Sequence, residues 1–192
     1  MTTTPFYSPH DIQQITIENP VTQRPSISWT GLENLGSNDS FAVTTQPLYT
    51  ISGLWMEKFL STTNQLQCTQ FNIPDNGRNV VGIEFQLNIQ RASRIQDAII
   101  QLTLNGELIG ENYANSINPV QSDMYTGDLT APIPVGNYHI YGGVSDVWNT
   151  ELSSADVADA SFGIVIQFSS NHIYPHKDLA YINQVGIRVT YE

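Results

Sequence analysis

NVVGIEFQLNIQ, at residues 79–90, alternates apolar side chains with polar or small ones. This period of two is that of a β-strand with one buried and one wet face. The apolar face carries Val81, Ile83, Phe85, Leu87 and Ile89, and the wet face carries Gly82, Glu84, Gln86, Asn88 and Gln90. A slip of one residue would move every apolar side chain into water, so the pattern also specifies the register.

Other stretches repeat this character at residues 95–104, 161–168 and 181–191. Asn105-Gly106 follows the first of them and is a strong signal for a tight hairpin. The only helical turn expected is at residues 152–157, where Ser153 is placed to cap it and Asp156 follows three residues later. Many strands, spaced turn signals and almost no helix predict an all-β fold, an antiparallel two-sheet β-sandwich of jelly-roll-like type.

The chain is poor in charge for its size. Of its 192 residues 40% are hydrophobic and only 13% are charged, about half the usual share of charge. Asn, Gln, Ser and Thr must therefore form the polar surface, which suits subunit contacts because neutral groups cost less to desolvate than charges. The alternative is simply a viral or extracellular β-protein. A net charge of −11 with seven Lys and Arg argues against nucleic acid and anionic membranes as partners.

Cysteine usage and the first residues bear on the compartment. Cys68 is the only cysteine, which excludes an intramolecular disulfide, and we expect it to be a small buried strand residue. The start MTTTPFYSPH has neither the basic nor the apolar region of a signal peptide. Because no apolar run reaches the length of a membrane span, we expect synthesis in the cytoplasm and no membrane partner.

Residues 1–25 differ from the rest in containing Pro5, Pro9, Pro20 and Pro25. Proline removes hydrogen-bond donors and favours extended neighbours, so we expect an extended N-terminal arm with one short edge strand around residues 13–18. The sandwich domain then spans residues 26–192. The arm is either a loose terminus or an element that docks on a neighbouring subunit. In the second case the partner-binding residues are Phe6, Tyr7, Ile12, Ile15 and Ile17.

No catalytic or metal-binding pattern stands out. His172 and His176 are four residues apart, but Pro175 between them argues against the helix that would bring them together on zinc. Asn38 and Asp39 are only a weak calcium signal. No pair of carboxylates is singled out for glycoside hydrolysis, and neither a G-x-S-x-G elbow nor a phosphate loop is present. The sequence therefore predicts a protein that is not an enzyme and has no cofactor.

Several aromatic residues fall in predicted loops. Tyr113, Tyr125 and Trp148 are candidates to stack on a glycan or to anchor a protein interface. The alternative is that Trp148 and Tyr141 cap the core, as large aromatic side chains often do.

The motifs from Trp29 to Glu192 together resemble a β-sandwich module of tailed-bacteriophage virion structural proteins. The resemblance rests on Trp29, FNIP at 71–74, VGIEFQLNIQRA at 81–92, DVW at 146–148, LSSADV at 152–157, FGI at 162–164 and YINQVGIRVTY at 181–191. In that pattern a glycine often follows the tryptophan, where this chain has Asn149. Similar modules occur in tail, neck, baseplate, fibre and head-decoration proteins.

The resemblance implies a non-enzymatic virion structural protein, synthesised in the host cytoplasm. It would assemble onto other capsid, neck or tail proteins through the N-terminal arm and the sandwich surface. A homo-oligomer is compatible with this role, with three chains around an axis as one arrangement. The alternative function is a carbohydrate- or receptor-binding β-sandwich displayed on the virion, with a host glycan as its partner.

Overall fold

The computed structural model describes residues 1–18, 26–35, 42–44, 50–52, 58–60, 62–91, 95–115, 138–170 and 180–192. Its strands are β1 (Thr2–Thr3), β2 (Asp11–Ile15), β3 (Trp29–Thr30), β4 (Ala42–Thr44), β5 (Thr50–Ser52), β6 (Lys58–Leu60), β7 (Gln65–Thr69), β8 (Val80–Arg91), β9 (Ile95–Leu104), β10 (Glu107–Ile109), β11 (Tyr138–Gly143), β12 (Gly163–Ser170) and β13 (Ala180–Tyr191). The helices are η1 (Leu32–Asn34), η2 (Tyr113–Asn115) and α1 (Ser154–Ala158).

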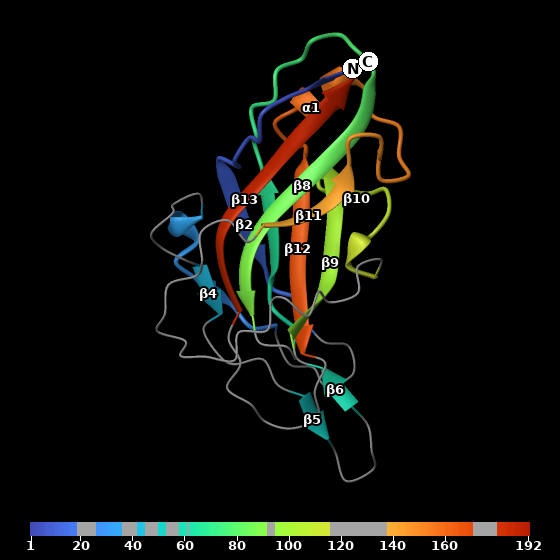
Figure 1. Ribbon diagram of the computed structural model, residues 1–192. Coiled ribbons are helices and arrows are strands. Elements are labelled where there is room, and N and C mark those ends of the chain that lie inside the picture. The colour runs from blue at the N-terminus through green and yellow to red at the C-terminus, as the bar shows by residue number, and fades with distance from the viewer. Residues whose placement is uncertain are drawn as a thin grey trace.

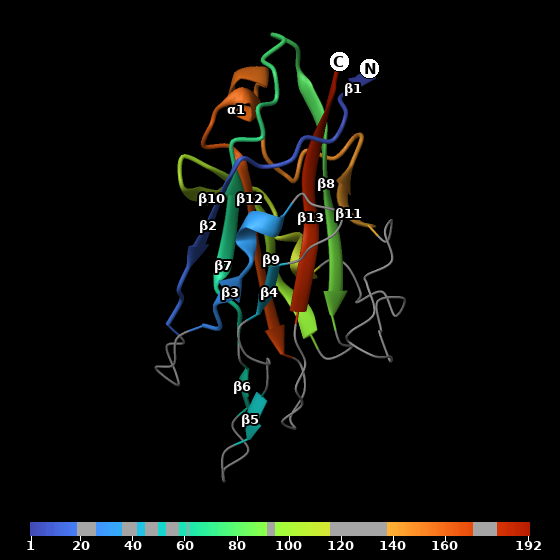
Figure 2. The same ribbon diagram turned by 90° about the vertical axis from the view of Figure 1, so that its left-hand side faces the viewer.

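Two antiparallel sheets pack face to face, which confirms the predicted β-sandwich (Figures 1 and 2). The six-stranded sheet has the order β11-β8-β13-β4-β3, with β1 paired to β13. The five-stranded sheet has the order β10-β9-β12-β7-β2, and β5 pairs with β6 in a separate two-stranded sheet. Figure 2 shows the sheets as two layers, with β8 and β13 in one and β7 and β12 in the other.

The core lies between these layers and is built from the alternating strands. On β8 the side chains of Ile83, Phe85, Leu87 and Ile89 are at most 4% exposed, as the sequence pattern predicts. The ring of Phe85 stacks on Tyr141 of β11 with centroids 5.7 Å apart. Burial of each such side chain stabilises the fold by about 1.5–3 kcal/mol, so the paired apolar faces provide the main driving force.

The opposite face of β8 is less wet than predicted, which is a correction. Glu84 is 7% exposed and Asn88 is 1% exposed. Glu84 is buried because Arg188, its cross-strand partner on β13, forms a two-pronged ion pair with it, with Nε–Oε2 at 2.6 Å and Nη2–Oε1 at 2.8 Å. Such bidentate pairing satisfies the carboxylate while it is removed from water.

The N-terminal segment is extended but belongs to both sheets of its own chain. β1 pairs with β13, and Tyr7 exchanges backbone hydrogen bonds of 2.7 and 2.9 Å with Ile187. β2 then pairs with β7, so residues 1–15 cross from one sheet to the other along one side of the sandwich. The edge strand therefore lies at 11–15 rather than 13–18, and the expected boundary at residue 25 falls outside the described residues.

Local signals in the sequence were reliable where they act over a few residues. Asn105 and Gly106 adopt φ of +54° and +81°, as the predicted tight hairpin between β9 and β10 requires. At α1 the Ser153 hydroxyl accepts from Asp156 N while the Asp156 carboxylate accepts from Ser153 N, which completes a capping box. Cys68 is fully buried in β7, as predicted.

Candidate interaction surface

The predicted partner-binding residues of the arm mostly contact the same chain. Tyr7 and Ile12 pack against the core, and the Phe6 ring lies 4.5 Å from the guanidinium carbon of Arg188. The Ile17 side chain is half-buried, whereas Ile15 is 39% exposed. Of the five, Ile15 alone is an exposed large apolar side chain.

A partly buried hydrogen-bond network anchors the arm further, and sequence analysis did not find it. Gln14 Oε1 accepts from Trp29 N at 3.0 Å, while its Nε2 donates to Trp29 O at 3.3 Å. The same Oε1 accepts from Asn64 Nδ2 at 3.1 Å, and Asn64 is 2% exposed. Ser26 Oγ accepts from Ile17 N at 2.8 Å and donates to Asn64 Oδ1 at 2.5 Å. A single glutamine in a polar arm gives no sequence signal for such a role.

Trp148 does not provide an exposed aromatic platform, and that prediction is wrong. Its side chain is 0% exposed, and its Nε1 donates to the Ile83 carbonyl at 2.9 Å. Tyr141 is 1% exposed, so the alternative that both residues cap the core is confirmed. The physical reason is Gly142, because a Cβ there would lie 2.4 Å from Trp148 Nε1; the missing side chain makes room for the indole.

Tyr113 is half-buried and is held by two contacts. Its ring lies 4.4 Å from that of Trp148, and its hydroxyl donates to Asp146 Oδ2. Burial, followed by that hydrogen bond and the Asp146 charge, raises the pKa of Tyr113. Asp146 Oδ1 also accepts from Trp148 N at 2.8 Å, and thus helps to fasten the turn. Tyr125, the third predicted aromatic, lies outside the described residues.

Asn149 stands where the virion-protein pattern often has glycine. The turn nevertheless has left-handed backbone geometry, with φ of +56° at Trp148 and +51° at Asn149. Asparagine is among the non-glycine residues that tolerate this region best, so the turn forms without a glycine at this position.

The described part of the chain has neither a metal-binding cluster nor a helix that could cross a membrane. No group of three or more His, Cys, Asp or Glu there is placed to hold a metal ion. His172, His176, Asn38 and Asp39 lie outside the described residues. None of the described helices has both the length and the apolar character needed to cross a membrane.

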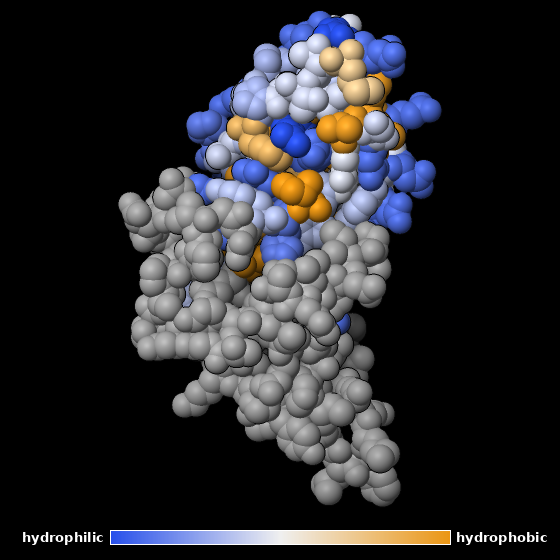
Figure 3. All heavy atoms as spheres, in the orientation of Figure 1, coloured by the Kyte–Doolittle hydropathy of each residue, from blue (hydrophilic) through white to orange (hydrophobic). Residues whose placement is uncertain are grey.

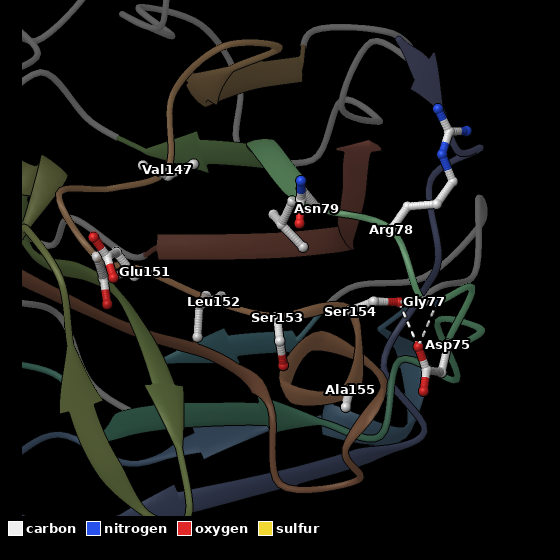
Figure 4. Close-up of a pocket in the computed structure, with 12 residues that line it drawn as sticks. Asp75, Gly77, Arg78, Asn79, Val147, Glu151, Leu152, Ser153, Ser154 and Ala155 are labelled. Atoms are coloured by element: carbon white, nitrogen blue, oxygen red, sulfur yellow. Dashed lines mark hydrogen bonds between the residues drawn. The ribbon is translucent and has the colours of Figure 1, made fainter. Parts of the chain in front are cut away.

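A pocket of 410 Å³ lies at one end of the sandwich, between residues 75–80 and 147–155 (Figure 4). Ser154 Oγ donates to Asp75 Oδ1 at 2.5 Å and accepts from Asn76 N at 2.8 Å. The Ser154 hydroxyl and Gly77 N lower the pKa of the Asp75 carboxyl. The lining residues include neither histidine nor cysteine, and the Asp75 carboxylate that accepts from Ser154 Oγ is a weak base because its pKa is lowered. The hydrogen bonds of Ser154 instead hold the turn.

The outer face of the five-stranded sheet consists mostly of neutral side chains. Strand register and side-chain alternation place three rows of side chains across it. These rows, here called the uncharged face, are Leu108, Thr103, Gly163 and Thr69; Gln101, Val165, Gln67 and Gln13; and Ile99, Gln167, Gln65 and Ile15.

The one charged side chain that these rows reach is that of Asp11, the cross-strand partner of Thr69, at the margin of the first row. Asp11 lies at one corner, beside Thr69, and its Oδ2 accepts from Gln13 Nε2 at 2.9 Å. The exposed acidic residues of the described chain lie outside these rows, although Glu107 is next to Leu108 on β10: Glu18, Glu33, Asp75, Glu107, Glu111, Glu151, Asp159 and Glu192. In a chain of net charge −11, an uncharged sheet face of this extent is a specific feature.

The uncharged face has an ordered centre and accessible margins. Val165 at its centre is 4% exposed and Thr103 is 1% exposed, whereas Leu108 and Ile15 at opposite edges are 46% and 39% exposed. Gln101 Nε2 donates to Gly110 O at 2.8 Å, which holds that side chain along the sheet. Gln167 and Thr69 are also only 6% and 8% exposed, so the centre of this face is already buried within the chain and its accessible side chains lie toward its margins.

The outer face of the six-stranded sheet is different. It contains the Glu84–Arg188 ion pair, and on β11 and the following turn Ile140 and Val144 are 42% and 45% exposed. Figure 3 shows hydrophobic and hydrophilic groups interspersed over the coloured part of this side of the molecule. Mixed character makes this face the less distinctive of the two.

Comparisons with family models, with curated proteins and with solved structures found no match to this chain.

Proposed function

We propose that this chain is a non-enzymatic structural protein of a tailed-bacteriophage virion, which assembles onto neighbouring virion proteins through its sandwich surface. The observation that carries the proposal is the uncharged face. Interface cores are depleted in charged residues, and the exposed side chains of this face, Leu108, Gln13 and Ile15, are neutral.

The low overall charge and the sequence resemblance support the same role. Only 13% of the residues are charged, so few charges would have to be removed from water or paired when such a surface is buried against another protein. The motifs that resemble phage sandwich modules supply the virion context. None of those motifs is a catalytic constellation, and the Asp75–Ser154 pair stabilises a turn.

Of the five arm residues that the sequence predicted to bind a partner, only Ile15 is assigned to the docking surface in this proposal. Tyr7, Ile12 and Gln14 hold residues 1–18 on the chain's own sheets. Ile15 then becomes part of the uncharged face, at its β2 edge. In this proposal the arm extends the docking surface by one strand.

The test is mass spectrometry of phage particles purified by density gradient from a culture that carries this gene. Peptides of this chain should co-sediment with the particles at a ratio to the major capsid protein that stays constant through repeated gradients. A ratio that falls to the level of an abundant host cytoplasmic protein would contradict a virion role.

The glycan-binding alternative has lost its best aromatic candidate, because Trp148 is in the core. Tyr113 also has its hydroxyl bound to Asp146. That alternative predicts saturable binding of the purified chain to a glycan array, abolished by Tyr125→Ala. The proposed structural role predicts no such binding.

A further inference from the structure

We propose that Asn105, at the tip of the β9–β10 hairpin, is a site of spontaneous deamidation, in which water converts its side-chain amide to a carboxylate. The chain contains two Asn-Gly pairs, Asn105-Gly106 and Asn76-Gly77, which carry the same chemical groups. The fold leaves the first pair reactive and protects the second. This modification is independent of the proposed virion role.

The reaction uses only atoms of the pair and one water molecule. The backbone nitrogen of the glycine loses its proton and attacks the side-chain carbonyl carbon Cγ of the asparagine. The new N–Cγ bond closes a succinimide ring, the Cγ–Nδ2 bond breaks, and Nδ2 leaves with the proton as ammonia. Water then adds to one of the two ring carbonyls and opens the ring, which yields aspartate or isoaspartate.

The two pairs give the attacking nitrogen equal steric access. All four residues are exposed, and a Cβ built at Gly77 or Gly106 would meet no atom within 4 Å. Both glycines also have positive φ, at +66° and +81°. Since glycine has no Cβ to hinder the approach of its nitrogen, crowding does not distinguish the two pairs.

At the Asn76 pair the attacking nitrogen is occupied. Gly77 N donates to Asp75 Oδ1 at 3.0 Å and to Ser154 Oγ at 3.2 Å (Figure 4). A hydrogen bond to a carboxylate stabilises the protonated amide, and the nearby negative charge opposes formation of the amide anion that attacks. Asn76 N also donates to Ser154 Oγ at 2.8 Å, so the turn is fastened to α1 at two successive residues.

At the Asn105 pair the attacking nitrogen has no such partner. Gly106 N donates to no acceptor among the residues that the structure describes. The pair forms the two-residue turn between β9 and β10, and the pairing of Leu104 with Glu107 leaves this nitrogen at the tip. Loss of its proton is therefore not opposed by a hydrogen-bonded carboxylate.

The asparagine carbonyls, in contrast, are bound in both pairs. Asn76 Oδ1 accepts from Arg78 N at 3.0 Å. Asn105 Oδ1 lies 3.1 Å from Ser161 Oγ, whose hydroxyl proton is shared with Asp159 Oδ1 at 2.6 Å. A donor at Oδ1 draws electron density from Cγ, the atom that is attacked. Because both carbonyls have such a donor, the glycine nitrogen decides the difference between the pairs.

The products change the hairpin to different extents. Aspartate at position 105 adds one negative charge two residues before Glu107. Isoaspartate also adds one carbon to the backbone, so the two-residue turn that joins Leu104 to Glu107 no longer fits its geometry. The three-residue edge strand β10 should then loosen from β9.

The experiment follows both pairs in one sample of the full chain. Purified protein is incubated at mildly alkaline pH, either folded or unfolded in guanidinium chloride, and is then digested at acidic pH with a glutamate-specific protease. Residues 58–84 and 85–107 are released as peptides that carry one pair each. Mass spectrometry measures the replacement of NH₂ by OH, and electron-transfer fragmentation separates aspartate from isoaspartate.

The expected result is a similar rate at both asparagines in denaturant. In the folded chain Asn105 should react about tenfold or more faster than Asn76, since a hydrogen bond to a charged group is worth about that factor. Asp75→Ala should raise the rate at Asn76 and leave that at Asn105 unchanged. Asn105→Ser should abolish the mass gain in residues 85–107, which also contain Asn88.

Two outcomes would overturn the proposal. One is a folded chain in which Asn76 reacts as fast as Asn105, and the other is a folded chain in which Asn105 stays intact while the denatured chain is converted. An unchanged Asn76 rate in folded Asp75→Ala would contradict protection by that carboxylate. The comparison of folded and denatured wild type needs no variant. None of these results bears on the virion role, which is decided separately by co-sedimentation with particles.

Discussion

Replacing Gly142 with alanine tests how Trp148 is seated in the core. Gly142 has φ of +75°, and a Cβ there would lie 2.3 Å from Ile83 O and 2.4 Å from Trp148 Nε1. A left-handed alanine costs about 1–2 kcal/mol. Overpacking adds about 1–3 kcal/mol. Loss of the Trp148–Ile83 hydrogen bond adds about 1–3 kcal/mol because the carbonyl stays buried.

These contributions overlap in space and do not simply add, so we expect a loss of about 3–6 kcal/mol in the free energy of unfolding. That is a large part of the about 5–15 kcal/mol that stabilises a typical domain. For a domain of this size it corresponds to a fall of about 6–24 °C in Tm.

The neighbouring Gly143 is the matched control. A Cβ at Gly143 would meet only Asp146 Cβ, at an ordinary 3.7 Å. Gly143→Ala should therefore change stability by less than about 1 kcal/mol, and restricting the unfolded chain can even make it stabilising. Urea unfolding followed by tryptophan fluorescence measures both variants. Equal stability of the two would refute the assigned packing of Trp148.

Three further predictions concern the arm, the buried thiol and the helix cap. Gln14→Ala should destabilise the fold by about 0.5–1.5 kcal/mol because it removes the side-chain hydrogen bonds to the Trp29 backbone, whereas Gln13→Ala should cost under about 0.5 kcal/mol. Urea midpoints measure the difference, and equal midpoints would contradict the anchoring network. Burial, and secondarily the Asp11 charge, raise the pKa of Cys68 from 9.0 to about 12, so the unfolded chain releases the thiol proton first and stability falls as pH rises from 9 to 12. Relative to Cys68→Ala, the wild type should lose up to about 1.4 kcal/mol per pH unit in that window, and parallel pH profiles would argue against a buried thiol. Ser153→Ala should cost about 1 kcal/mol by removing the cap of α1, and Ser153→Asp should recover most of it in thermal unfolding; failure of the aspartate to recover stability would contradict the cap.

Sequence patterns predicted the structural features that are decided by residues close together in the chain. The alternation in β8, the Asn105-Gly106 hairpin and the Ser153 cap are decided within a few residues. Contacts between distant segments were not predictable in this way. Glu84 is buried because Arg188 from the last strand reaches it, and Trp148 is buried because Gly142 leaves room on another strand.

The arm and the uncharged face show the same division. The prolines of the N-terminal arm indicated an extended segment, as residues 1–18 are. An extended segment can pair with the sheets of its own chain or with another chain, and only the fold shows that β2 pairs with β7. The outward glutamines of β7 and β9 can be read from alternation alone. That they form one neutral surface depends on the strand order β9-β12-β7-β2, which brings together segments far apart in the sequence.

Hydroxyl-radical footprinting of the chain, free and within purified particles, tests the central claim most directly. Leu108 and Ile15 are exposed aliphatic side chains at opposite edges of the uncharged face, and Ile140 and Val144 are equally exposed beside the other sheet. We predict that oxidation of Leu108 and Ile15 falls sharply in the assembled form while that of Ile140 and Val144 is unchanged. Protection of Ile140 and Val144 with Leu108 and Ile15 still oxidised would contradict the account.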